Sequence, residues 1–338
     1  MNQQCNRRAT TSRGTRNTKR GALQSGNHRR QVGQVYLFAR AQRRHRLSAY
    51  RTTKASLEEA HLDQNRLGEL LAKGRDPAHA VLIYAQNFAS VMAEKMSVLK
   101  ELRQYARTVE KAEDEYIPGF PPMSPVTISY FTMWAFFDVL FGQSHETIGT
   151  CLQRLAREVS FQGWLMDAIN VMQNSRMGFY VHCGIEDRYV RLREIDGGEI
   201  KRCYSTSGYN GEEGQIWFAR PIAPSHSLAT HHVVMTTPYV LLGTTERMLS
   251  AYLAREIARM GAKHLPRGMD AQTFLMKHGP SPNHWNEYIF CGYVNFQNDA
   301  VFISGIPDMR ETLPCAPGNV FPRHQRRGGA GPLARRLE

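Results

Sequence analysis

Apolar residues recur every three or four positions through the first half of the chain, the period of amphipathic helices. Asp76 and Pro77 are favourable residues for the start of a helix, and no proline or glycine follows until beyond Asp114. One apolar stripe runs through this segment: Val81, Ala85, Phe88, Met92, Met96, Leu99, Leu102, Ala106 and Val109. A helix of about 38 residues would be about 57 Å long. The pattern therefore predicts a helical hairpin or an intermolecular coiled coil.

Further helices are predicted before residue 175. A capping box at Ser56 marks the start of this helical region, 56–175, and a proline-rich connector divides it at 117–125. Three helices then follow, at 127–141, 145–158 and 161–174. The first is apolar on nearly all sides and should be buried, which makes Asp138 within it conspicuous. Asp138 is either a cap for a neighbouring helix or a candidate catalytic acid with a raised pKa.

Near Gly178 the apolar period changes from 3.6 to 2, which indicates β-strands. Asp196-Gly197 lies between two alternating runs and predicts a tight hairpin. Five or six short strands up to Leu242 predict an antiparallel β module at 176–243, either a small barrel or a curled sheet.

The last third again mixes helix and strand. A helix should begin at Thr245 and end at Met260, a short one covers 271–277, and a helical run extends from 284 to 295. A final buried strand is predicted at 301–303. The sequence thus predicts an α+β fold, with segment 244–315 packing on the helical domain.

The charge is concentrated at the two ends. The net charge is +13, yet the first acidic residue is Glu58, and the body between the two ends is mildly acidic. Segments 1–55 and 316–338 are basic and lack an apolar period, so we expect them to be disordered. The N-terminal segment is an arm for nucleic acid or another polyanion, a targeting peptide or an extension without function. The arginines of such an arm include Arg29, Arg30, Arg40, Arg43, Arg44 and Arg46.

Two sets of side chains suggest chemistry, although neither forms a known motif. His278, His284 and Glu287 lie near one helix start, and this residue combination suits zinc or ferrous iron. The six cysteines are scattered, with no C-x-x-C pair, and Cys183 is a candidate nucleophile only with a distant histidine. The pattern assigns no cofactor.

The β module offers two further binding hypotheses. The glycines of loop 208–214 suggest a phosphate cradle, but strands flank this loop and Glu212 and Glu213 would repel phosphate. Basic and aromatic side chains also alternate on the strands, as in single-strand nucleic-acid binding: Tyr189, Arg191, Arg193, Lys201, Arg202, Tyr204 and Trp217. A solvated sheet face explains the second pattern better, because acidic residues outnumber basic ones in this region.

These observations favour a cytoplasmic binding or interaction protein that self-associates through the long helix and has no catalytic activity. The alternatives are a nucleic-acid-binding protein that uses the basic arm and a metal- or cysteine-dependent enzyme. The longest apolar stretches, such as 133–140, are too short to span a bilayer, so no membrane partner is expected.

Overall fold

The computed structural model describes residues 67–307, apart from 98, 100–101, 118–120, 160–162, 226–228, 262–264, 267 and 298. The basic segments 1–55 and 316–338, and with them the arginines of the proposed arm, lie outside the described residues. The helices are α3 (Pro77–Ser97), α4 (Arg103–Tyr116), α5 (Ile128–Phe137), α6 (Ile148–Val159), α7 (Gly163–Asn174), α8 (Glu246–Met260), α9 (Ala271–His278) and α10 (His284–Gly292). The strands are β1 (Gly178–Glu186), β2 (Tyr189–Glu194), β3 (Ile200–Ser205), β4 (Ile216–Ala219), β5 (Pro221–Ile222), β6 (His232–Val234), β7 (Tyr239–Leu242), β8 (Tyr293–Gln297) and β9 (Ala300–Ser304).

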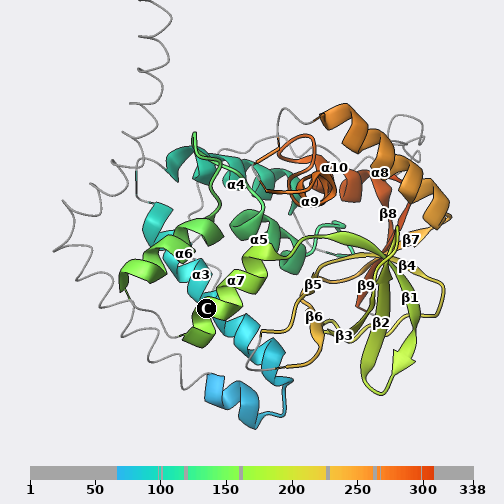
Figure 1. Ribbon diagram of the computed structural model, residues 1–338, viewed down its shortest axis with the longest axis horizontal. Helices are drawn as coiled ribbons and strands as arrows, with labels where there is room; N and C mark the ends of the chain where they lie inside the picture. The colour runs from blue at the N-terminus through green and yellow to red at the C-terminus, as the bar shows by residue number, and fades with distance from the viewer. Residues whose placement is uncertain are drawn as a thin grey trace, which may run out of the picture.

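The strands form one curled sheet in the order β5-β6-β3-β2-β1-β4-β7-β9-β8 (Figure 1). This confirms a mixed helix and strand fold with a curled sheet. Two details differ from the sequence prediction. The sheet recruits β8 and β9 from the C-terminal segment, and the pairs β3–β6 and β7–β9 are parallel. Both differences arise from pairings between strands that are distant in the sequence.

Both faces of the sheet are packed. Phe179, Phe218 and Tyr239 face the main core, where α8 and α10 contribute Tyr252 and Trp285. The intervening residues point the other way and, with residues of neighbouring strands, form a second, smaller apolar cluster inside the curl: Tyr180, Val190, Leu192, Cys203, Trp217, Ala219, Val234, Val240 and Ala300. This alternation is the two-residue period of a strand. Here both sets of side chains are apolar, so each face of the sheet contributes to a hydrophobic cluster.

The helices of the first half pack together on one side of the molecule, with α3 against α6 and α7 (Figure 1). The predicted single helix over 77–114 is not confirmed, because α3 ends at Ser97 and α4 begins at Arg103. The apolar stripe of α3, including Val81, Phe88 and Met92, is buried within the chain itself. The stripe therefore supplies the core of this protein.

Local sequence signals set several element ends. The Asp76 carboxylate accepts from the N–H groups of Ala78 and His79 and caps α3, and the Thr245 hydroxyl caps α8. The helical run predicted over 284–295 is wrong beyond Gly292, because Tyr293–Gln297 forms strand β8. Among the described residues, no helix has the length and apolar character needed to cross a bilayer.

Candidate functional site

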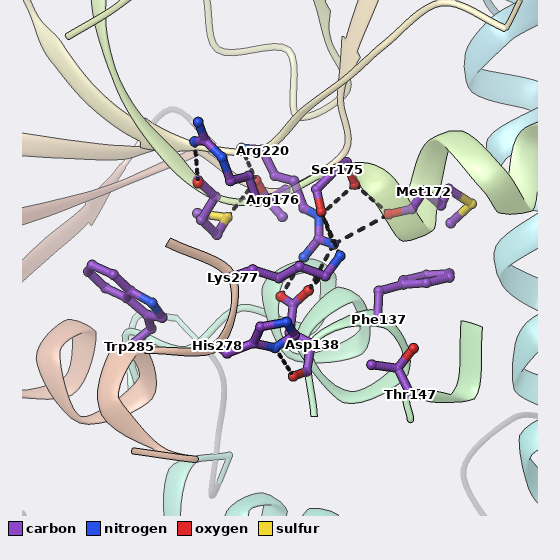
Figure 2. A network of polar contacts seen from close by, with 12 residues as sticks. Phe137, Asp138, Thr147, Met172, Ser175, Arg176, Arg220, Lys277, His278 and Trp285 are labelled. Carbon is purple, nitrogen blue, oxygen red and sulfur yellow. Dashed lines mark hydrogen bonds and ion pairs between the residues drawn. The ribbon is translucent and has the colours of Figure 1, made fainter. Parts of the chain in front are cut away.

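A buried cluster of charged side chains joins the helical layer to the sheet (Figure 2). Asp138 is the C-cap of α5, Arg220 follows β4, and Lys277 lies in α9. The Arg220 guanidinium donates to both carboxylate oxygens of Asp138, over 2.6 Å and 3.0 Å. The Lys277 Nζ lies 3.5 Å from the same carboxylate. All three side chains are at most 4% exposed, so water screens these charges little.

The single carboxylate of Asp138 faces two cations, and carbonyl oxygens at the end of α7 offset the remaining positive charge. Lys277 Nζ donates to the carbonyl oxygens of Gln173 and Ser175, and Arg220 donates to Ser175 and Met172. These carbonyls belong to the C-terminal turn of α7 and the residue after it, where the helix dipole is negative. The donors of both cations are therefore used within the protein, and the cluster is a rigid structural joint.

Burial shifts the pKa of two basic side chains at this joint, Lys277 and His278. Burial, reinforced by the positive charge of Arg220, lowers the pKa of Lys277 to about 7, although Asp138 opposes this shift. Burial also lowers the pKa of the neighbouring His278. The Nδ1 of His278 lies 2.7 Å from the carbonyl oxygen of Asp138 and must donate to it. In the neutral ring Nε2 is then a hydrogen-bond acceptor.

A cavity of about 480 Å³ adjoins this cluster, with Asp138 and His278 in its wall. It lies between the end of α5, helices α8 and α9, and the turn that follows α9. Most of its wall is apolar, from Val139, Leu140, Met260, Phe274, Pro280 and Pro282; the polar residues are Asp138, His278, Glu256, Arg259 and Ser281. Its size and its few polar groups are typical of small-molecule sites.

The sequence hypothesis gave the Asp138 carboxylate two possible roles, a cap for a neighbouring helix or a functional acid. In the structure this carboxylate accepts from Arg220, and only the backbone N–H of Asp138 caps a helix, its own helix α5. The same hypothesis did not identify Arg220 or Lys277. The sequence did contain a signal for both residues, because each is a single cation directly after an apolar run. Arg220 follows Ile216–Ala219, and Lys277 follows Phe274-Leu275-Met276. A charge in such a position must find a partner when it is buried, but the sequence does not reveal which one.

The structure does not gather the proposed metal ligands around one point. His278 contacts the Asp138 carbonyl, whereas His284 Nε2 lies 3.0 Å from the Tyr252 hydroxyl. Glu287, on the first turn of α10, has interactions of its own. Within the part of the chain that the structure describes, no group of three histidine, cysteine or acidic side chains is arranged to hold a metal ion.

Among the described residues, the two buried cysteines are unsuited to act as nucleophiles. Burial raises the pKa of Cys151 and Cys203 to about 12, which disfavours the reactive thiolate. Cys183 is half-buried, and its Sγ lies 3.5 Å from the carbonyl oxygen of Val181.

Ion pairs and burial also weaken the case for a nucleic-acid face on the strands. Arg193 is paired with Glu246, and Lys201 with Glu194, while Trp217 is fully buried. Bases could not stack on a tryptophan in that position.

Comparisons of the chain with known protein families, with curated proteins and with solved structures gave no match. The geometry of the cavity and of the adjoining charged cluster therefore carries the functional argument.

Proposed function

We propose that this protein binds a small molecule with an apolar body and a hydrogen-bond donor in the cavity beside Asp138 and His278. The observation that carries this proposal is the combination of an apolar cavity of about 480 Å³ with a histidine in its wall whose Nδ1 bonds to the Asp138 carbonyl oxygen. The sequence led us to expect a binding protein, and we now propose a binding site and a class of ligand for it.

The shape of the cavity supports binding without a large rearrangement. The wall at Asp138 is held by Arg220 and Lys277, whose own donors are saturated. A second wall is held by the N-capping of α9, where Asp270 accepts from the Thr273 N–H over 2.8 Å. A preformed site loses little conformational entropy when a ligand binds.

The polar groups of the cavity define the ligand. His278 Nδ1 is committed to the Asp138 carbonyl, so the ring offers an acceptor and can bind a hydroxyl or an N–H. Glu256 adds a second acceptor and is itself held by Arg259 Nη1 over 2.8 Å. The remaining wall favours an aromatic or branched aliphatic body.

The other hypotheses have less support. Self-association was inferred from the apolar stripe of one long helix, and the residues of this stripe in α3 lie in the core of the chain. Nucleic-acid binding by the arm at 1–55 stays a separate proposal, which predicts affinity that falls steeply with salt and is lost when this segment is deleted.

Native mass spectrometry of the full-length chain tests the proposal. We expect the native mass to exceed the denatured mass by one discrete small molecule. Leu140→Trp, which places an indole in the cavity, should remove the excess. Leu242→Trp, at a position 39% exposed on β7, is the matched control and should retain it.

The wild-type protein without added mass, or an excess that persists in Leu140→Trp, would contradict the proposal. A thermal unfolding curve of each variant separates loss of ligand from loss of fold. Integer multiples of the bare chain mass would instead support the interaction protein.

A further inference from the structure

A second hollow, of about 570 Å³, is lined by residues of the sheet and its loops. It is a cleft between the loop that joins β3 to β4 and the hairpin of β8 and β9, and we call it the loop cleft. It shares no lining residue with the cavity at Asp138. Any activity of the loop cleft is therefore independent of the function proposed above.

The loop of this cleft is held in place by His182 of β1. The ring Nε2 of His182 lies 2.7 Å from the carbonyl oxygen of Asn210, and its Nδ1 accepts from the Gly184 N–H over 3.2 Å. The backbone of His182 also bonds to Gly214 and Gln215, over 2.9 Å and 2.8 Å. These contacts fix the loop in one conformation and give the cleft a preformed wall.

The glycines of the loop have structural roles. Gly211 has a φ of +69°, and a Cβ at this position would lie 2.4 Å from the Trp217 ring. Gly208 and Gly214 also have positive φ. Only glycine adopts these conformations easily, which explains the spacing that resembled a phosphate cradle.

The side chains of the loop cleft are suited to hydroxyl groups. Amides of Asn210, Gln215 and Gln297 provide donors and acceptors, and carboxylates of Glu212 and Asp299 provide acceptors. The Gln215 Oε1 already accepts from the Tyr209 hydroxyl and the Trp217 Nε1, each over 3.1 Å. This orientation makes the amide nitrogen of Gln215 a donor for a ligand.

Aromatic rings complete the wall of the loop cleft. Tyr209 and Phe302 meet edge to face, with centroids 6.2 Å apart and an interplanar angle of 85°. Both residues line the cleft. Such a corner gives the apolar face of a ring a surface to pack against, while the amides and carboxylates bind its rim.

Charge excludes phosphate ligands. The residues that line the loop cleft include Glu212 and Asp299 and no lysine or arginine. A phosphate or a nucleic-acid backbone would meet two carboxylates there and no cation to offset their repulsion. A neutral molecule with several hydroxyl groups gains hydrogen bonds from both the amides and the carboxylates and has no charge to be repelled.

We propose that the loop cleft binds a neutral polyhydroxylated ligand, that is, a saccharide. Its hydroxyl groups bond to the amides and carboxylates, and one apolar face of the sugar ring packs against Tyr209 and Phe302. An organic cation is the competing ligand, because two carboxylates beside aromatic rings also attract ammonium groups.

Saturation-transfer NMR with the full-length protein tests this inference. The probes are the methyl glycosides of glucose, galactose and mannose, with choline as the cationic competitor. We expect at least one glycoside to receive saturation at its ring protons and to be released by an excess of the matching disaccharide, and choline to receive none.

Two adjacent loop residues form a matched pair of variants. Glu212 lines the cleft, whereas the neighbouring Glu213 does not, and both are exposed. Glu212→Ala should weaken glycoside binding about tenfold, the effect of a lost hydrogen bond to a charged group. Glu213→Ala should leave it unchanged. Binding of choline alone, no saturation of any glycoside, or equal loss in both variants would overturn the inference.

Discussion

Two buried aspartates each hold a separate cluster of side chains, and the clusters differ in how far the partners of the aspartate reach into solvent. Asp138 is paired with Arg220, which is 1% exposed. Asp76 is paired with His231 and with Arg188, each over 3.1 Å, and the Arg188 side chain is 56% exposed. Both carboxylates are themselves almost fully enclosed.

The two clusters indicate that the exposure of the paired cation determines how strongly a buried carboxylate contributes to stability. In the closed cluster, removal of one partner leaves a charge without water and without compensation. In the open cluster, Arg188 can return to solvent, so the ion pair contributes little. The closed cluster around Asp138 is therefore the one that can hold a cavity wall in a fixed position.

Asp138→Asn should have the largest effect on stability. The variant keeps the shape of the side chain but leaves Arg220 and Lys277 without their carboxylate, and we expect a loss of about 3–5 kcal/mol in the free energy of unfolding. Urea unfolding measures it. Asp187→Asn, at an exposed position with a φ of +55° that asparagine tolerates, is the control. A loss below about 1 kcal/mol would contradict a closed cluster.

Lys277 should make the stability of the closed cluster depend on alkaline pH. Its pKa is about 7 in the folded protein and 10.5 as an isolated group, so between these values the unfolded chain binds more protons. The free energy of unfolding should then rise with pH in this window, by up to about 1.4 kcal/mol per pH unit. Lys277→Met should lose this slope. An identical slope in both proteins would contradict the assignment.

Two histidines near Asp76 should make the stability of the protein depend on acid pH. Burial lowers the pKa of His79 and of His232 from 6.5 to about 4. Below pH 6.5 the unfolded chain binds more protons at these positions, so the free energy of unfolding should fall between pH 6.5 and 4. His79→Gln should reduce this fall, and a curve parallel to that of the wild type would contradict the prediction.

Of the four substitutions compared here, Asp76→Asn should change the free energy of unfolding least. Asparagine keeps the N-cap of α3, and the substitution removes the negative charge that faces Arg188 and His231. We expect a loss of about 1 kcal/mol in urea unfolding. A loss equal to that of Asp138→Asn would remove the distinction between the two clusters.

The sequence predicted the local features of this fold well. The Asp196-Gly197 turn lies between β2 and β3, and the helix caps at Asp76 and Thr245 are at the positions that the local sequence predicted. These features depend on interactions between residues near each other in the chain.

Features that depend on distant pairs were missed. The predicted helical run extended to residue 295, but Tyr293–Gln297 forms β8, which joins the sheet through β9, and β9 pairs with β7 about 60 residues earlier in the chain. Asp138 lies 82 residues from Arg220 and 140 from His278. The composition indicated that Asp138 was unusual, but the cluster and the cavity exist only in the folded chain.

Methyl NMR can show whether the cavity beside Asp138 and His278 is a ligand site. The full-length protein is labelled at its methionine ε-methyl groups. Phenol is the probe, because it combines an apolar ring with a hydroxyl donor for His278. Met260 lines the cavity, and we predict that its methyl signal shifts with phenol until the site is saturated. The signal of Met123, which is 61% exposed, should not shift. Leu140→Trp should abolish the shift. An unchanged Met260 signal, or a shift that persists in Leu140→Trp, would contradict the claim.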